Sequence, residues 1–150
     1  MNSETYTVQD DGNRGILLLP KGDHLYTLIF LHGLGDSAEG FVDVFAENDV
    51  VPATCKVVLP TAPRKPVSCN NGYVMNSWFD IYNLSGTPES LEEIRKEYSQ
   101  DDLKESIAYL TELVRKEADL IEGKDTKRVF IGGFSQGCMV SLATLISIDF

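Results

Sequence analysis

The run Gly133-Phe134-Ser135-Gln136-Gly137 constrains the fold of this chain more than any other stretch. It matches the pattern G-x-S-x-G, follows a β-rich run at residues 128–131, and precedes an apolar run long enough for a helix. A strand that turns sharply into a helix at this pattern lifts the serine hydroxyl to the top of a sheet, as a nucleophile elbow. The flanking glycines leave room for the turn. Ser135 is therefore the candidate catalytic nucleophile.

Strand-like and helix-like patterns alternate along the rest of the chain. We expect strands at 16–19, 25–31, 56–59 and 129–131, and an edge strand near 5–8. Helices are expected around Phe41 to Phe45, from an N-cap at Ser99 to about Gly123, and at 136–148, with a helical turn capped by Thr87. Residues 61–88 show no period and read as a long functional loop. This alternation predicts an α/β fold with a mainly parallel sheet and flanking helices.

Composition excludes several function classes. The 150 residues read as one domain or part of one, and a net charge of −10 argues against nucleic acid or an anionic membrane as the main partner. The sequence contains no signal peptide pattern and no apolar run of membrane-spanning length, so no integral membrane segment is expected. Cys55, Cys69 and Cys138 form no C-x-x-C pair, so we expect no metal site and a reducing, cytoplasmic setting.

A second glycine-rich loop, at residues 32–36, follows a different expected strand. In a parallel sheet the carboxyl ends of the strands meet at one edge, so this loop should lie near Ser135. We expect the backbone N–H groups of Leu34 and Gln136 to form an oxyanion hole there. The loop also fits the dinucleotide pattern G-x-G-x-x-A, but the next expected strand ends in Leu59-Pro60-Thr61, without the acid that a cofactor site requires.

The general base that Ser135 needs is not evident. Hydrolases with this elbow carry their acid and then their histidine after the serine, whereas only Asp149 and no histidine follow Ser135 here. Asp149 would lie about 20 Å away along the helix. His32 precedes the oxyanion-hole residue, so its ring is expected to steady the loop, and His24 is expected at the surface.

The expected helix at 136–148 is apolar around almost its whole circumference, which is typical of a helix inside a larger core. The chain offers little to cover it, and the strand before it would become an exposed apolar edge. The sequence therefore predicts a fold that is truncated after the elbow helix.

Four runs together resemble the acyl-protein thioesterases, a carboxylesterase and lysophospholipase-like branch of the α/β-hydrolases. They are Phe30-Leu31-His32-Gly33-Leu34-Gly35-Asp36, Pro60-Thr61-Ala62-Pro63-Arg64, Asn76-Ser77-Trp78-Phe79-Asp80-Ile81 and Gly132-Gly133-Phe134-Ser135-Gln136-Gly137. The resemblance implies that residues 1–150 are the N-terminal portion of a single α/β-hydrolase domain. The family's triad Asp and His lie beyond the part that matches.

The resemblance further implies a cytoplasmic serine hydrolase that cleaves long-chain acyl thioesters or esters without a cofactor, for example S-palmitoyl groups on proteins. Acylated proteins or lipid esters would be its substrates. Ser135 would be the nucleophile, Leu34 and Gln136 the oxyanion donors, and Leu34, Trp78 and Phe79 candidate substrate contacts. Plain core packing is an equal alternative for Trp78 and Phe79. The alternative for the whole chain is a non-catalytic relative that binds acyl groups or a protein.

Overall fold

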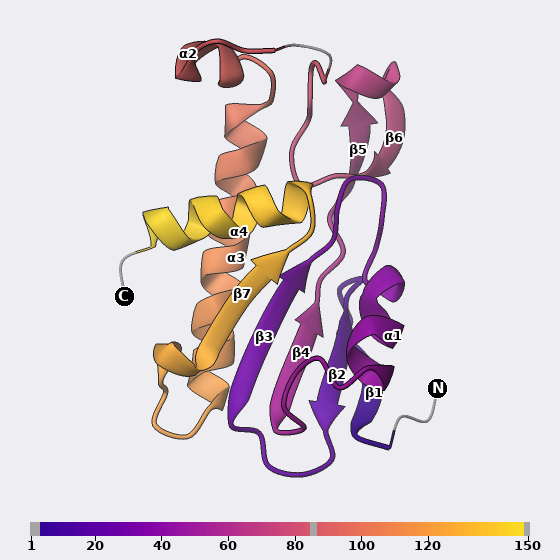
Figure 1. Ribbon diagram of the computed structural model, residues 1–150, viewed down its shortest axis with the longest axis vertical. Coiled ribbons are helices and arrows are strands. Elements are labelled where there is room, and N and C mark those ends of the chain that lie inside the picture. The colour runs from indigo at the N-terminus through magenta and orange to yellow at the C-terminus, as the bar shows by residue number, and fades with distance from the viewer. Residues whose placement is uncertain (1–3, 85–86, 149–150) are drawn as a thin grey trace.

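The computed structural model describes residues 4–84 and 87–148, which form a layered α/β structure (Figure 1). The main sheet has the strand order β1 (Tyr6–Asp10), β2 (Ile16–Pro20), β4 (Cys55–Leu59), β3 (Tyr26–Leu31) and β7 (Val129–Gly133). The helices are α1 (Glu39–Glu47), α2 (Leu91–Ile94), α3 (Gln100–Leu120) and α4 (Gln136–Ser147). The main-sheet strands and the helices α1, α3 and α4 lie where the sequence patterns predict them.

The main sheet is parallel on one side and antiparallel on the other. Strands β4, β3 and β7 pair in parallel, whereas β1 and β2 pair antiparallel with each other and β2 with β4. A chain that continues into a parallel strand must first cross back to the other end of the sheet, which takes a dozen residues or more. Residues 11–15, between the neighbours β1 and β2, and residues 21–25, between β2 and β3, are both too few for that. These short connections are why β2 runs opposite to the other four strands of the main sheet.

Alternate residues of the central strands bury into two separate cores. Val57 and Leu59 of β4 point into a cluster with Val42 and Phe45 of α1. Val58 points to the other face, into a cluster that α3 and α4 complete. The two helical layers therefore hold the central strands from both sides, which fixes the ends of β3, β4 and β7 where the candidate site residues follow.

A hairpin occupies much of the stretch that we expected to be irregular. Strands β5 (Arg64–Val67) and β6 (Tyr73–Asn76) pair antiparallel, so that expectation was wrong. Asn71 and Gly72 in the connecting loop both have positive φ, at 56° and 76°. An Asn-Gly pair is a strong hairpin signal, but the polar, proline-containing strand at Arg64–Val67 hides it.

The cap of α2 was also placed wrongly. The helix begins after Ser90, not Thr87, because the Ser90 side chain accepts a hydrogen bond from the backbone N–H of Glu93. An N-cap side chain accepts a hydrogen bond from the N–H of the third helical residue, which is Glu93 here. Ser90 stands three positions before Glu93, whereas Thr87 stands six positions before it.

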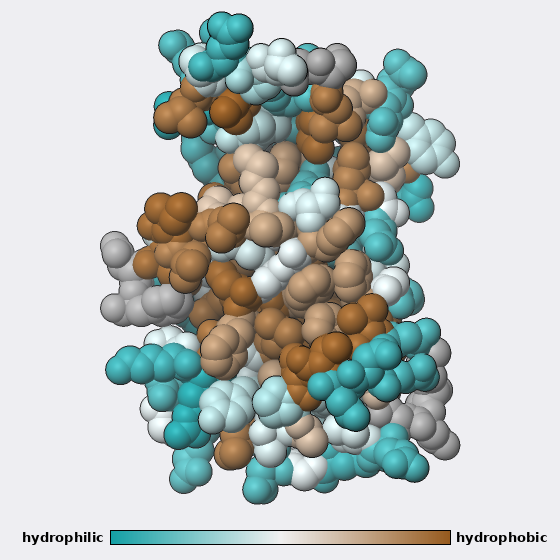
Figure 2. Space-filling model, viewed as in Figure 1, coloured by the Kyte–Doolittle hydropathy of each residue, from teal (hydrophilic) through white to brown (hydrophobic). Residues whose placement is uncertain are grey.

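Large apolar side chains remain exposed on β7, on α4 and in the turn between them. The exposed fraction is 53% for Phe130, 61% for Phe134 and 86% for Ile146. Figure 2 shows this hydrophobic surface over α4 and across the neighbouring sheet. Within residues 4–84 and 87–148, β7 is an edge strand, as the sequence predicted. No helix of the described part has the length and apolar character needed to cross a membrane. Asp149 lies outside the described residues.

Candidate active site

Ser135 lies at a sharp turn between β7 and α4. Its φ is 51° and its ψ is −114°, a combination that residues other than glycine rarely adopt. The turn is closed by a hydrogen bond of 2.9 Å from the Gly137 N–H to the Phe134 carbonyl. The side chain is exposed, and its hydroxyl makes no hydrogen bond within the described residues. The structure thus presents a strained serine with a free hydroxyl at the N-terminus of a helix.

The two glycines of the motif are required by close backbone contacts. A Cβ at Gly133 would come closer than 3.0 Å to the backbone of Gly137, and one at Gly137 would come equally close to the carbonyl oxygens of Leu31 and His32. Helix α4 therefore starts directly against the end of β3. This contact brings the end of β7 and the loop after β3 together.

The backbone N–H groups of Leu34 and Gln136 have no acceptor among the described residues. Both residues line the same pocket as Ser135. The other N–H groups of the Leu34 loop are occupied: Gly35 donates to Asn76, Asp36 to Gly33 and Ala38 to the Thr61 hydroxyl. The free donors beside Ser135 are therefore those that the sequence analysis selected for an oxyanion hole.

This pattern of donors weighs against the dinucleotide interpretation of the loop. A diphosphate is held by several free backbone N–H groups at a helix N-terminus. Here the N–H of Ser37 also donates to the Asp36 carboxylate. Among residues 34–38, the backbone N–H of Leu34 is therefore the one without an acceptor in the described part of the chain. A single free N–H suits one developing oxyanion better than a pyrophosphate.

The pocket beside Ser135 has a volume of about 340 Å³ and a mainly apolar wall. Its lining includes Leu34, Phe79, Ile81, Leu84, Tyr98 and Met139, besides Ser135 and Gln136. Glu97 also lines it, and its Oε2 is buried without a hydrogen-bond partner in the described part of the chain. The pocket can therefore hold an apolar chain next to the hydroxyl of Ser135.

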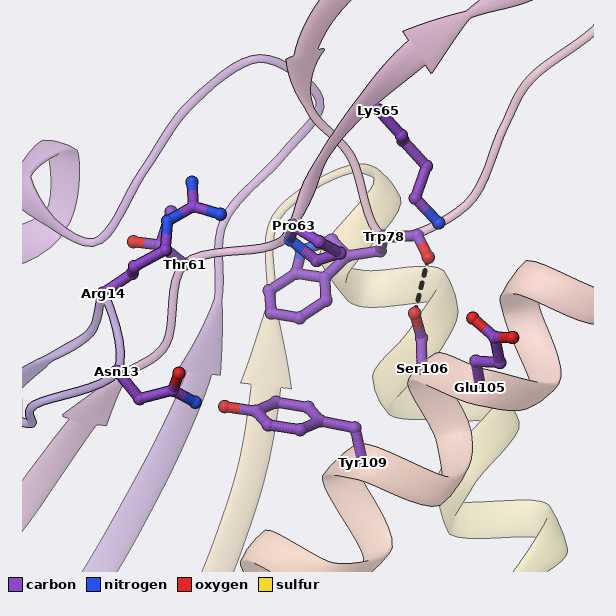
Figure 3. Close-up of a pocket in the computed structure, with 9 residues that line it drawn as sticks. All are labelled: Asn13, Arg14, Thr61, Pro63, Lys65, Trp78, Glu105, Ser106 and Tyr109. Carbon is purple, nitrogen blue, oxygen red and sulfur yellow. Dashed lines mark hydrogen bonds between the residues drawn. The ribbon is translucent and has the colours of Figure 1, made fainter.

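Trp78 and Phe79 differ in their relation to this pocket. Both side chains are 2% exposed, but only Phe79 contributes to the pocket wall. The Trp78 indole N–H donates to the His32 carbonyl at 2.9 Å, and the ring lies beneath the loop that carries Leu34. Trp78 instead lines a second pocket of about 310 Å³ (Figure 3), together with Arg14, Lys65 and Tyr109.

His32 has both ring nitrogens occupied by the backbone. Nε2 accepts from the Ala62 N–H at 3.0 Å, so Nδ1 carries the proton and donates to the Gly33 carbonyl at 2.6 Å. The ring is 1% exposed, and burial lowers its pKa below the ordinary value of 6.5. A neutral imidazole bound in this way steadies the loop, as expected, and has no nitrogen left to receive the Ser135 proton.

Apart from Glu97 and Tyr98, no titratable side chain of the described residues lines the pocket beside Ser135. His24 precedes β3, so it lies at the opposite end of the parallel strands from Ser135, and its Nε2 forms a hydrogen bond of 2.8 Å with the Thr27 hydroxyl. We expected His24 at the surface, whereas the structure shows it half-buried. Within residues 4–84 and 87–148, no three His, Cys, Asp or Glu side chains could hold a metal ion together. The described residues therefore place an exposed serine hydroxyl and two backbone N–H groups without an acceptor in one pocket, and no histidine lines that pocket.

Known proteins provide an independent comparison. Residues 17–149 match the model of the phospholipase/carboxylesterase family. Acyl-protein thioesterase 1 of Yarrowia lipolytica is 40% identical over 126 residues, which cover 83% of this chain and 52% of that protein. The Schizosaccharomyces pombe protein of the same name is 39% identical, covering 85% and 52%. The chain thus spans about half the length of these curated relatives.

Solved structures give the same result at the level of the fold. Acyl-protein thioesterase 2 of Zea mays superposes with a TM-score of 0.63 and 29% identity, covering 88% of this chain and 50% of that one. SOBER1 of Arabidopsis thaliana superposes with a TM-score of 0.65 and 30% identity, covering 80% and 54%. The layered sheet is therefore an α/β-hydrolase fold.

Proposed function

The chain belongs to the phospholipase/carboxylesterase family, and from this membership we propose that Ser135 is the nucleophile of a serine hydrolase. One observation carries the proposal: a strained serine with a free hydroxyl shares a pocket with two unoccupied backbone N–H groups, those of Leu34 and Gln136. A nucleophile beside preorganised donors is the arrangement that acyl transfer requires.

The substrates we propose are long-chain acyl thioesters or esters, including S-palmitoyl groups on proteins. The apolar wall with Phe79 and Met139 supports an acyl chain, and relatives carry the name acyl-protein thioesterase. Lipid esters are the second substrate class, in keeping with the family's description. Because all three cysteines are free, we also propose a reducing, cytoplasmic location for the protein. A tagged full-length protein found in the secretory pathway would contradict that location.

In the proposed reaction, the Ser135 Oγ attacks the acyl carbonyl carbon. The carbonyl oxygen becomes an oxyanion that accepts hydrogen bonds from the Leu34 and Gln136 N–H groups, while a base takes the Ser135 proton. The C–S or C–O bond then breaks, and the leaving group departs as a thiol or alcohol with that proton. Water then releases the acyl group from Ser135. We propose that residues outside these 150 supply the base, since both nitrogens of His32 are occupied. Residues 1–150 would then be the N-terminal portion of one hydrolase domain.

Fluorophosphonate labelling tests this proposal, because such probes react with serines that a base activates. The full-length protein should be labelled and should hydrolyse a long-chain acyl thioester, and Ser135→Ala should abolish both. Ser147→Ala removes a hydroxyl from the other end of the same helix, where it bonds to the Ala143 carbonyl and lines no part of the pocket, so it should change neither.

The isolated 150-residue chain should show negligible turnover. Rapid hydrolysis by that chain, lost in Ser135→Ala, would show that it contains a base after all. A folded full-length protein that binds acyl groups and is unaffected by Ser135→Ala would instead favour the non-catalytic relative.

A further inference from the structure

The side chain of Gln136 is buried and makes hydrogen bonds that its backbone role does not require. It is 4% exposed, and its Oε1 accepts from the Trp78 N–H at 2.8 Å. Its Nε2 donates to the Phe79 carbonyl at 2.7 Å and to the Ser77 hydroxyl at 3.1 Å. A backbone N–H must meet the amide oxygen and a carbonyl must meet the amide nitrogen, so the orientation of this side chain is fixed.

The same short segment, residues 76–79, which we call the brace, also holds the loop that carries Leu34. The Asn76 carbonyl accepts from the Gly35 N–H at 2.9 Å, and the Asn76 side chain donates to the Asp36 carbonyl at 2.8 Å. On the other side of Leu34, the Trp78 indole N–H donates to the His32 carbonyl at 2.9 Å. Leu34 is therefore fixed from both sides by the brace.

The brace is itself anchored on α3. The Ser106 hydroxyl donates to the Trp78 carbonyl, as Figure 3 shows. The N–H of Asp80, the residue after the brace, donates to the Asp102 carboxylate at 2.8 Å. A segment anchored on a helix of the core can transmit a fixed position to whatever it holds.

We infer that the brace sets the spacing between the two oxyanion donors, and that the Gln136 side chain is a positioning residue for its own backbone N–H. This inference rests on the proposed function. Leu34 and Gln136 belong to different elements, and the brace binds both with hydrogen bonds of 2.7–3.1 Å. Oxyanion donors act only when they lie at hydrogen-bond distance from the oxygen of the transition state, so a small displacement is costly.

The chemistry of glutamine is what this position requires. Glutamate could accept from the Trp78 N–H but could not donate to the Phe79 carbonyl, and methionine of similar size could do neither. Gln136→Met should therefore keep a side chain of similar volume but remove the hydrogen bonds between position 136 and the brace. Asn76→Ala, at a more exposed position, should instead loosen the Leu34 loop, because it removes the hydrogen bond to the Asp36 carbonyl.

The test uses the full-length protein with Gln136→Met, Asn76→Ala and Ser135→Ala. Gln100→Met is the matched control, since Gln100 also donates to a backbone carbonyl, that of Arg95, but does not line the pocket beside Ser135 and does not bond to the brace. Hydrolysis of an acyl thioester gives kcat and KM. A long-chain trifluoromethyl ketone, to which Ser135 would add to form an oxyanion, reports the donors without turnover.

We expect Gln136→Met and Asn76→Ala to lower kcat by about 100-fold with little change in KM, near the loss caused by removal of one oxyanion donor. The affinity for the trifluoromethyl ketone should fall in parallel, and Gln100→Met should match the wild type. A loss of folding stability alone would leave the inhibitor affinity of the folded fraction unchanged.

Two results would be decisive against the inference. If a folded Gln136→Met protein keeps kcat and inhibitor affinity within threefold of wild type, the brace does not position the donors; if that variant does not fold, Asn76→Ala decides by the same criterion. If the wild-type protein shows no activity that Ser135→Ala removes, the proposed function itself is wrong and this inference falls with it.

Discussion

Ser135 holds a backbone conformation that costs of the order of 1–3 kcal/mol, so its surroundings must hold it there. The surroundings are the close contacts at Gly133 and Gly137. A strained residue that is held by its neighbours cannot relax away from the helix N-terminus. This rigidity keeps Ser135 in the pocket that Leu34 and Gln136 also line.

Gly137→Ala should destabilise the protein by about 1–3 kcal/mol, because the new methyl group would overlap the carbonyl oxygens of Leu31 and His32. Urea unfolding followed by circular dichroism measures the change. Gly22→Ala is the control, since nothing lies within 4 Å of a Cβ at that turn position. Equal stability of the two variants would mean that α4 can move away from β3 at no cost.

The buried ring of His32 should make stability depend on pH. Burial lowers its pKa below 6.5 in the folded state, so the unfolded chain binds the proton first as pH falls. Stability from this residue is constant above about pH 6.5 and decreases below it until the folded-state pKa is reached. His32→Gln, which keeps an acceptor for the Ala62 N–H, should flatten this slope. His24→Gln, at a half-buried ring, should flatten it less, and an unchanged slope in His32→Gln would contradict the assignment.

At the scale of single residues, the sequence predicts which residues belong to the motifs but not the partners of their side chains. Ser135, Leu34 and Gln136 follow from the two glycine-rich loops, and they do line one pocket. The hydrogen bonds between the Gln136 side chain and the brace could not be predicted, because the partners are 57–59 residues away in a stretch without periodicity. Sequence reasoning also could not predict that Trp78 and Phe79 line different pockets, because the sequence pattern does not give the direction of each ring.

Among the elements, α3 contributes most to the placement of the site, because the brace is anchored on it. A buried ion pair joins this helix to the sheet: Lys56 of β4 lies 2.7 Å from Glu117, with side-chain exposures of 8% and 3%. A buried pair of this kind is costly to break from one side, since it leaves a charge without a partner.

Lys56→Met should therefore cost about 3–5 kcal/mol, whereas Lys56→Met combined with Glu117→Leu should recover most of that loss. Urea unfolding of the single and double variants measures both values. Lys104→Met removes the exposed partner of Asp101 and serves as the control, for which little change is expected. A double variant as unstable as Lys56→Met alone would show that packing, and not the unpaired carboxylate, causes the loss.

The parallel strands and long helices were predictable because their apolar periods are set by burial on one or two faces. The hairpin of β5 and β6 was not, since Arg64–Val67 carries two cations and a proline and so lacks the alternation of a strand. The hairpin is joined to the rest of the fold through Asn76 of β6, which forms hydrogen bonds with the Leu34 loop. Tertiary contacts of this kind leave little trace in local sequence.

For the molecule as a whole, the exposed apolar side chains of β7 and α4 contribute to the hydrophobic area in the middle of Figure 2. Contiguous apolar surface and an open strand edge both favour association with other chains. In the isolated chain, we therefore expect the exposed apolar side chains to lower solubility, without a change in the fold.

The isolated 150-residue chain should self-associate, and Ile146→Lys should reduce this association without loss of folding stability, because that side chain is 86% exposed. Sedimentation velocity at several concentrations measures the effect. Leu91→Lys, at a side chain that is 76% exposed on the distant helix α2, is the control and should change association little. A chain that stays monomeric at high concentration would contradict this prediction.

The position of Trp78 gives the protein a built-in optical reporter. It is the single tryptophan of the chain, it stacks on Tyr109 at a ring distance of 6.1 Å, and its indole N–H is bound to the loop that carries Leu34. Its emission should therefore be that of a shielded indole, and should shift to longer wavelength when the brace opens and water reaches the ring. Fluorescence can thus follow the proposed oxyanion hole directly, with no label and no substrate.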